Sequence, residues 1–328
     1  MSSKKVTCVS CLAFFLVSCQ FIPLEAQLQV GYYGNSCRMA EFIVKDEVKK
    51  GLMGDKGLAA GLVRMHFHDC FVRGCDGSVL IDSTPFNMAE KDAPPNNPSL
   101  RGFEIIDNAK AKLESVCPGV VSCADIIAFA ARDSTEMTQG LGYEVPAGRR
   151  DGRVSVASEV TANIPAPGFN LMQLTQSFAM KGLTQEEMVT LSGAHTIGRS
   201  HCTSFSKRLY GSNTTQGQDP TLDASYAALL MQECPQGDTD SSLVVPMDPF
   251  SPTVMDTSYY SDVQANQGLF TSDQALLTDE ATAGLVSQNA MDMSLWQRNF
   301  ANAMVKMGSI GVLTGDAGEI RTNCRVIN

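Results

Sequence analysis

The segment from residue 62 to residue 80, LVRMHFHDCFVRGCDGSVL, concentrates side chains that can do chemistry. It holds Arg64, two aspartates, two cysteines, and two of the four histidines of the 328-residue chain, His66 and His68. If the segment is a strand, Arg64, His66 and His68 share a face, and a strand H-x-H pair can bind zinc. If it is a helix, Arg64 and His68 lie one turn apart and His66 points elsewhere. The preceding GLAAGLV has apolar residues at helical spacing and favours the helix.

The helical reading pairs an imidazole with a guanidinium on one rigid element. A neutral His68 could accept a proton and return it, while Arg64 stabilises negative charge as it develops. This pairing suits the cleavage of a weak O–O bond. A zinc site would be short of ligands, because His195 and His201 lie far along the chain and no H-E-x-x-H sequence is present. A core histidine with only a structural role is the simpler alternative.

A third histidine lies in a different setting, in the sequence MVTLSGAHTIG. Helical spacing places Met188, Leu191 and His195 along one face, so that the imidazole ends an apolar stripe. Gly193 and Gly198 flank it and would let a bulky group approach closely. An imidazole in an apolar wall is a natural axial ligand of haem iron. A hydrogen-bonded core histidine again remains the alternative.

Two loops are rich in oxygen ligands and could hold calcium. The first would be closed by a disulfide between Cys70 and Cys75, and the second is interrupted by prolines. Neither loop matches the EF-hand pattern, and aspartate and serine are also common turn residues. The pattern therefore leaves calcium binding and plain turn formation both open. The two sets are Asp69, Asp76 and Ser78, and Asp248, Ser251 and Asp256.

The elements that must position these groups are mostly helices. Apolar residues recur at helical spacing in six further segments, and no ladder of alternating strands is present. Thr184 and Glu187 form a capping box at the start of one of these helices. The helical segments are 40–53, 102–116, 123–137, 171–183, 184–195 and 294–308. The long loops between them are 83–102, 147–169 and 211–220, a length at which loops are usually functional or stapled.

Residues 1–26 read as a secretory signal peptide, which leaves a mature chain of residues 27–328. Lys4 and Lys5 precede the apolar CLAFFLVSC, and the small Ala26 offers a cleavage site. A membrane anchor is the alternative, but polar residues and a proline interrupt the apolar stretch. No later segment is apolar enough to span a membrane.

Cleavage of this signal changes the composition. Three of the 11 cysteines leave with it, and the remaining eight read as four disulfides of an exported protein. The formal net charge of −10 becomes −11, which makes nucleic acids and acidic polysaccharides poor partners. Asn213 begins a glycosylation sequon in a polar loop.

An ordered set of motifs closely resembles the class III secretory plant haem peroxidases, the horseradish peroxidase family. The likeness runs from about Gln27 to the C-terminus. It implies an all-α, two-lobed fold with one haem b between the lobes and two calcium ions. It also implies a secreted monomer that reduces hydrogen peroxide and oxidises small phenolic donors. The motifs are RMHFHDCFVRGCDGS, VSCADIIAFAARD, VPAGRRDG, NIPAPG, LSGAHTIG and RTNCRVIN.

The resemblance assigns roles to residues that match the family's motifs. Arg64 and His68 would be the catalytic pair, with Asn96 hydrogen-bonded to the ring of His68. His195 would be the axial iron ligand, with Asp273 as its carboxylate partner. His66 matches no functional residue of the family.

The calcium ligands and disulfides are implied in the same way. The distal ion would take Asp69, Val72, Gly74, Asp76 and Ser78, with Glu90 joined through water. The proximal ion would take Thr196, Asp248, Ser251, Val254 and Asp256. The implied disulfides are Cys37 to Cys117, Cys70 to Cys75, Cys123 to Cys324, and Cys202 to Cys234. Asp125 and Arg149 resemble a buried structural ion pair of the family.

The donor pocket departs from the family's best-known member. Pro94, Gly168 and Ser204 replace phenylalanines at the haem edge, and Tyr143 replaces its tryptophan. Pro165 matches the proline whose carbonyl binds a phenol.

The context of the reaction is expected to be the cell exterior. The short tail after Cys324 favours the apoplast over the vacuole, with roles in cell-wall and lignin oxidation, peroxide removal and stress response. Two alternatives are a zinc hydrolase built on His66 and His68, and a calcium-binding wall protein that keeps the scaffold without turnover.

Overall fold

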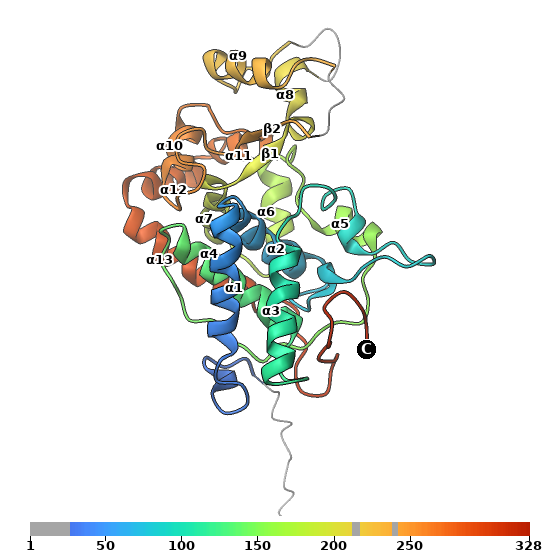
Figure 1. Cartoon of the computed structure of the whole chain (residues 1–328). Coiled ribbons are helices and arrows are strands. Elements are labelled where there is room, and N and C mark those ends of the chain that lie inside the picture. The colour runs from blue at the N-terminus through green and yellow to red at the C-terminus, as the bar shows by residue number, and fades with distance from the viewer. Residues whose placement is uncertain (1–26, 212–216, 238–241) are drawn as a thin grey trace, which may run out of the picture.

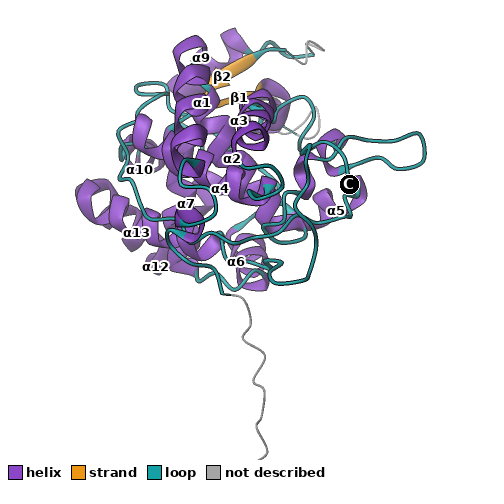
Figure 2. Cartoon of the chain, turned by 60° about the horizontal axis from the view of Figure 1, so that its bottom comes forward, coloured by secondary structure: helices purple, strands orange, loops and turns teal. Residues whose placement is uncertain are grey.

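The computed structural model describes residues 27–211, 217–237 and 242–328, and these residues form a mostly helical protein (Figures 1 and 2). The signal peptide prediction and Asn213 lie outside the described residues. Within them, the secondary structure comprises thirteen α-helices and one two-stranded sheet. The all-α class expected from the sequence is therefore confirmed. None of the helices in these ranges is long and apolar enough to cross a membrane.

The first core lies among four helices that stand side by side in the lower half of Figure 1. Their buried faces carry mainly Val, Leu and Ile, and the burial of these side chains stabilises the lobe. The helix of the opening segment, α2, packs closely against α4. The four helices are α1 (Ala40–Gly54), α2 (Leu58–Val72), α3 (Phe103–Val116) and α4 (Cys123–Met137).

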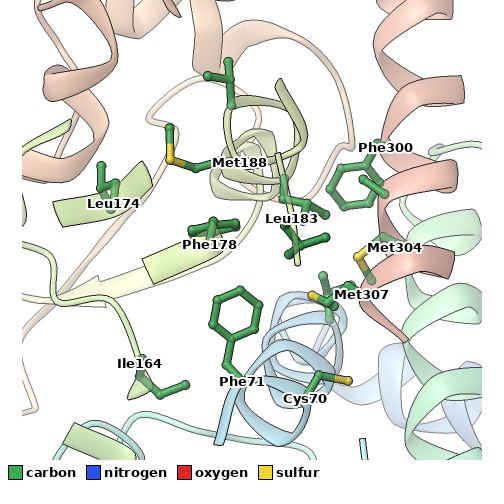
Figure 3. Packing of buried hydrophobic residues seen from close by; sticks show 14 of the residues in the cluster. Cys70, Phe71, Ile164, Leu174, Phe178, Leu183, Met188, Phe300, Met304 and Met307 are labelled. Carbon is green, nitrogen blue, oxygen red and sulfur yellow. The ribbon is translucent and has the colours of Figure 1, made fainter. Parts of the chain in front are cut away.

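The second core joins the last third of α2 to the helices of the other lobe. Figure 3 shows Phe71 of α2 pointing toward Phe178 of α6, and their rings are 5.0 Å apart. Met304 and Met307 of α13 pack into the same cluster. The helices are α5 (Ala157–Asn163), α6 (Leu171–Met180), α7 (Gln185–Ser192), α10 (Ser258–Gln264), α11 (Thr271–Gln274), α12 (Glu280–Met291) and α13 (Met293–Met307).

A smaller third core lies at the top of Figure 1. Strands β1 (Arg199–His201) and β2 (Val244–Pro246) pair antiparallel, with Ser200 opposite Val245. Helices α8 (Ser206–Tyr210) and α9 (Ala224–Glu233) cover this region.

Four disulfides cross-link segments of the chain near the ends of helices. They join the pairs that the resemblance implied: Cys37–Cys117, Cys70–Cys75, Cys123–Cys324 and Cys202–Cys234. The Cys123–Cys324 bond has a sequence separation of 201 residues and holds the C-terminal segment against α4. Such long-range closure restricts the unfolded chain most strongly.

Helix α7 ends earlier than the sequence predicted. It starts after the expected capping box of Thr184 and Glu187, but it stops at Ser192, and a 3-10 turn follows from Gly193 to Thr196. The hydroxyl of Tyr260 donates to the carbonyls of Val189 and Thr190, at 2.9 and 3.1 Å. The predicted helix over 184–195 is therefore wrong in its last turn. There the carbonyls at the end of α7 accept hydrogen bonds from a side chain of a distant helix.

Several other predictions of local structure need correction. The helix expected over 171–183 ends at Met180. The loop expected over 147–169 contains α5, and none of the predicted helical segments corresponds to α8, α9, α10, α11 or α12. These helices are short or lack a strong apolar stripe, so that their formation depends on packing against the rest of the protein.

Candidate active site

The helical reading of the opening segment is the one that the structure supports. Arg64 and His68 share a face of α2, and Nε of Arg64 donates to Nε2 of His68 at 3.1 Å. His66 points away and is buried, with Nδ1 3.6 Å from Sγ of Cys70. Burial lowers the pKa of His66 to about 3, so this histidine stays neutral. The two histidines therefore occupy different environments.

Among the described residues, Arg64 is held only by neutral acceptors. Its two terminal nitrogens donate to the carbonyl of Pro95 at 2.7 Å and the hydroxyl of Ser99 at 2.9 Å. Burial, and next the charge of Arg101, lower the pKa of Arg64 to about 10. The guanidinium thus stays charged at neutral pH, and its charge remains available to an anion in the site.

His68 is oriented from behind by an amide. Its Nδ1 lies 2.6 Å from Oδ1 of Asn96, while Nδ2 of Asn96 donates to the backbone carbonyl of Glu90 at 2.7 Å. Because the amide nitrogen is used as a donor, Oδ1 must accept, and the ring proton lies on Nδ1. Burial, and next the charge of Arg64, hold the pKa of His68 well below its usual 6.5. The neutral ring therefore carries its acceptor lone pair on Nε2, which accepts the Nε–H of Arg64 in this structure and can take a proton once that hydrogen bond opens.

His195 lies on the 3-10 turn after α7, with its side chain 38% exposed. Its Nδ1 is 2.7 Å from Oδ1 of Asp273, which also accepts the hydroxyl of Tyr259 at 3.1 Å. The rings of Tyr259 and Phe270 pack edge-on against the imidazole. Among the described residues Nε2 has no hydrogen-bond partner, so this nitrogen is available to a metal.

The segment that carries His195 lies against the helix that carries the catalytic pair. Gly198 has a φ of +105°, and a Cβ there would come within 2.9 Å of the side chain of Ala60 on α2. Ala60 lies one turn before Arg64. A histidine that has a carboxylate partner on Nδ1 and Nε2 open is the usual protein ligand of haem iron, so these residues fit that group.

A first oxygen cluster, the distal cluster of Asp69, Asp76, Ser78 and Glu90, lies at the C-terminal end of α2. Burial, and next the charge of Asp76, raise the pKa of Asp69 well above 3.8, while burial and Asp69 raise the pKa of Glu90 to about 9. Neither carboxylate oxygen of Glu90 has a well-formed hydrogen bond to the described residues, and neither has Oγ of Ser78. Buried carboxylates with unused oxygens are what a divalent cation would stabilise.

The backbone ligands expected for this cluster lie at the turn after α2. Val72 is the last residue of α2. The carbonyl of Gly74 accepts the backbone N–H of Asp76 at 2.8 Å. A Cβ on Gly74 would meet the backbone of Gly311 at 2.5 Å, so only glycine fits there.

A second cluster, the proximal cluster, surrounds Thr196, the residue after His195. Oγ1 of Thr196 lies 3.0 Å from Asp256, 3.4 Å from Asp248 and 3.5 Å from the carbonyl of Val254. Oγ of Ser251 donates to Asp248 at 3.1 Å. One hydroxyl proton on Thr196 cannot serve three oxygens at once, and a cation at their centre would.

Two residues of this second region were missed by the sequence reasoning. Ser258 places its hydroxyl among the proximal oxygens, in contact with Ser251 and Thr196. Asp262 is buried, and burial followed by the charges of Asp248 and Asp256 raises its pKa to about 7. The only sequence signal was the position of Ser258 two residues after Asp256.

Side chains alone do not form a complete metal site in either cluster. No three His, Cys, Asp or Glu side chains within the described ranges group closely enough to hold an ion. Each candidate set instead combines two carboxylates with hydroxyl and backbone oxygens, as calcium accepts and zinc rarely does.

The residues expected at the donor pocket lie in three segments, with Pro165 and Gly168 in the same loop. Pro165 is half-buried between α5 and α6, and Pro94, Gly168 and Ser204 are exposed.

The predicted structural ion pair lies within the fold. Nη1 of Arg149 contacts Asp125 at 2.7 Å, with both side chains buried, and Tyr33 also donates to Asp125.

Comparisons with known proteins agree with this arrangement. A peroxidase family model matches residues 44–292. The chain is 69% identical to "Peroxidase 5" of Vitis vinifera over the whole of both chains. It is 50% identical to "Peroxidase 3" of Arabidopsis thaliana over 97% of each, and to "Peroxidase 1" of Zea mays over 94% of this chain and 86% of that protein.

The chain therefore belongs to the peroxidase family, and within it to the class III plant peroxidases. It is an enzyme that uses hydrogen peroxide to oxidise a second substrate, and the family to which it belongs carries haem. A member of this family of enzymes is neither a zinc hydrolase nor a non-catalytic wall protein.

Proposed function

We propose that this protein is an extracellular haem peroxidase that reduces hydrogen peroxide to water and oxidises small phenols. The hydrogen-bonded chain Arg64–His68–Asn96 carries the proposal, since it sets up a neutral base and an unpaired cation on one helix face. Each turnover converts one peroxide and two phenols into two waters and two phenoxyl radicals.

His68 would move the proton during O–O cleavage. Its Nε2 accepts a proton from the bound peroxide and then returns it to the departing oxygen, which leaves as water. Arg64 stabilises the negative charge that develops on that oxygen, because its neutral partners leave its own charge uncompensated. Asn96 keeps the proton of the ring on Nδ1, so that Nε2 remains the base.

One haem b would be held by Nε2 of His195, and it supplies the redox-active iron at which peroxide is bound and cleaved. Asp273 accepts the Nδ1 proton of His195 and thereby raises the electron donation of the imidazole. The hydrogen bond from Tyr259 fixes the carboxylate in this position.

Two calcium ions would occupy the distal and proximal clusters. The distal ion would be linked to the base through Glu90, whose carbonyl holds Asn96. The proximal ion would be linked to the axial ligand through Thr196. Calcium thus has a positioning role and no redox role.

Membership of the class III plant peroxidases supports the proposed site of action and the proposed donor. Removal of residues 1–26 would release a mature protein of residues 27–328 into the apoplast as a monomer. The carbonyl of Pro165 would bind the phenol, and cell-wall oxidation, peroxide removal and stress responses are the processes in which such a reaction is used.

The test is to purify residues 27–328 and measure the absorption spectrum, the metal content and phenol oxidation with peroxide. We expect the Soret absorption of haem, one iron per chain, and turnover that depends on peroxide. The change His195→Ala should abolish stable haem binding, whereas His66→Ala should retain it. Zinc in place of iron, or haem without turnover, would contradict the proposal.

A further inference from the structure

One carboxylate oxygen of Asp273 accepts two hydrogen bonds from different side chains. Nδ1 of His195 lies 2.7 Å from Oδ1 of Asp273, and the hydroxyl of Tyr259 donates to the same Oδ1 at 3.1 Å. The other oxygen, Oδ2, accepts the backbone N–H of Phe270 at 2.8 Å. The imidazole and the phenol therefore share the negative charge of a single oxygen.

The phenol of Tyr259 is a permanent donor in this arrangement. Tyr259 and Asp273 are both buried, so bulk water does not replace the hydroxyl at Oδ1. Burial, and next the charge of Asp273, raise the pKa of Tyr259 well above 10, so the phenol keeps its proton. Its ring packs edge-on against the imidazole of His195, with 5.9 Å between the ring centres, and this contact holds the hydroxyl in place.

This donor changes the electronic effect of Asp273 on the axial histidine. A hydrogen bond to a carboxylate stabilises its charged form and makes it a weaker base. The phenol of Tyr259 therefore weakens the hydrogen bond in which Asp273 accepts the Nδ1 proton of His195. An imidazole that keeps its proton more firmly donates less electron density from Nε2 to a bound iron. Weaker donation favours ferrous over ferric iron.

The chain contains a second buried phenol that donates to a buried carboxylate. The hydroxyl of Tyr33 donates to Oδ2 of Asp125 at 2.7 Å. The ion-pair partner of Asp125 is Arg149, whereas that of Asp273 is His195. Loss of the Tyr33 hydroxyl thus removes the same kind of hydrogen bond at a carboxylate that does not contact the axial histidine.

We propose that Tyr259 sets the reduction potential of the iron held by His195, because its hydroxyl limits the strength with which Asp273 accepts the ring proton. The inference rests on the proposed function, in which Nε2 of His195 holds the haem iron. Tyr259 is a positioning residue in the reaction, since it acts on the iron through Asp273 and His195. Its hydroxyl keeps the iron easier to reduce than Asp273 alone would make it.

The experiment measures the ferric/ferrous midpoint potential of the holoenzyme by spectroelectrochemical titration. Tyr259→Phe removes the donor to Asp273, and Tyr33→Phe is the matched control. Asp273→Asn removes the carboxylate, and the variant with both Tyr259→Phe and Asp273→Asn completes a double-mutant cycle. A fluorinated tyrosine at position 259 keeps the hydroxyl and makes it a stronger donor. The iron–histidine stretching frequency of the ferrous protein, from resonance Raman spectra, is the second readout.

We expect Tyr259→Phe to favour ferric over ferrous iron by about threefold or more, a fall in potential of about 28 mV or more at about 59 mV per tenfold change. The iron–histidine frequency should rise, because the imidazole becomes a stronger ligand. The fluorinated tyrosine and Asp273→Asn should both shift the potential upward. Tyr33→Phe should match the wild type, and Tyr259→Phe should have no further effect once Asp273→Asn is present.

An unchanged or higher potential in Tyr259→Phe would overturn the inference. An equal shift in Tyr33→Phe, or a shift that persists in the presence of Asp273→Asn, would overturn it as well. If Tyr259→Phe does not retain haem, the fluorinated variant decides, and an unchanged or lower potential in that variant refutes the role of the hydroxyl. An unchanged potential and frequency in Asp273→Asn would instead contradict the axial pair of the proposed function.

Discussion

At the scale of single residues, the chemistry depends on which ring nitrogen of His68 carries its proton. Asn96 is fixed by the carbonyl of Glu90 and can only accept from Nδ1, so Nε2 faces the site as a base. The neighbouring His66 is buried, and its Nδ1 lies near Sγ of Cys70 and not near an amide or a guanidinium that would prepare it for proton transfer. Identical side chains two positions apart thus differ in function because the helix separates them.

Removal of either member of the catalytic pair should slow the reaction with peroxide and leave haem bound. For His68→Leu and Arg64→Leu we expect losses of at least about 100-fold in the second-order rate constant, because a positioned base or charge stabiliser contributes this much. Rapid-mixing spectroscopy measures the rate. Arg298→Leu is the control, since Arg298 is exposed on α13 and forms no ion pair among the described residues. Near-normal kinetics in either active-site variant would contradict the assigned roles.

The pH dependence of the same rate tests the environment of His68. Burial and Arg64 lower its pKa, so the ring stays neutral and the rate should not fall as pH decreases through 6.5. In Asn96→Asp, a carboxylate at Nδ1 would stabilise the protonated ring and raise its pKa. The rate of this variant should therefore fall at a higher pH than that of the wild type. A wild-type rate that halves near pH 6.5 would show a solvent-like histidine.

At the scale of elements, the end of α7 decides where His195 points. Gly193 begins the 3-10 turn, and the hydroxyl of Tyr260 and the indole of Trp296 close over it from α10 and α13. Both donate to carbonyls at the end of α7. The turn is thus built from three helices that are distant in sequence.

A methyl group at Gly193 should disturb this turn. A Cβ there would meet the Tyr260 hydroxyl at 2.5 Å and Nε1 of Trp296 at 2.6 Å. We expect Gly193→Ala to cost about 1–3 kcal/mol of stability through overpacking and to release haem more readily. Gly284→Ala is the matched control, because nothing lies within 4 Å of its Cβ in α12, and there alanine should stabilise by about 0.5–1 kcal/mol. Thermal melts and haem transfer to an acceptor protein measure both effects.

These contacts also explain what sequence could predict at this scale. The apolar residues of helices such as α4 recur at helical spacing, so these helices could be predicted from the sequence. The capping box likewise predicted the start of α7. The last turn of α7 could not be predicted, because Tyr260 and Trp296, which end it, follow about 70 and 100 residues later. Ser258 was missed for a similar reason, since its place among the proximal oxygens depends on the fold. The pairing of Arg64 with His68 needed only helical spacing.

At the scale of the whole molecule, negative charge gathers in two places that calcium would neutralise. The chain is already acidic, with a formal charge of −10 before signal cleavage. Asp69 and Asp76 face one end of α2, and Asp248 and Asp256 lie beside the axial segment. Each cluster is joined to one side of the site, so that loss of an ion affects stability and catalysis together.

Chelation should therefore lower the melting temperature and phenol oxidation in parallel. The proximal ion should leave first, because Ser251 and Asp256 are half-exposed whereas Asp69 and Asp76 are buried. Ser251 also lacks the branched side chain that would restrict its rotamer. Calcium counts, melts and activity on the same samples provide the test. Full activity after removal of both ions would refute the coupling.

The packing of Trp296 has a spectroscopic consequence. It is the only tryptophan of the chain, it is fully buried, and Nε1 donates to the carbonyl of Thr190 at 3.2 Å. All indole emission of the protein therefore originates at the junction of α7 and α13, next to the turn that holds His195. A shift of this emission to longer wavelength would report water entering that junction, and haem nearby would quench it. The protein thus contains an intrinsic fluorophore with which the loosening of its axial segment can be followed without a label.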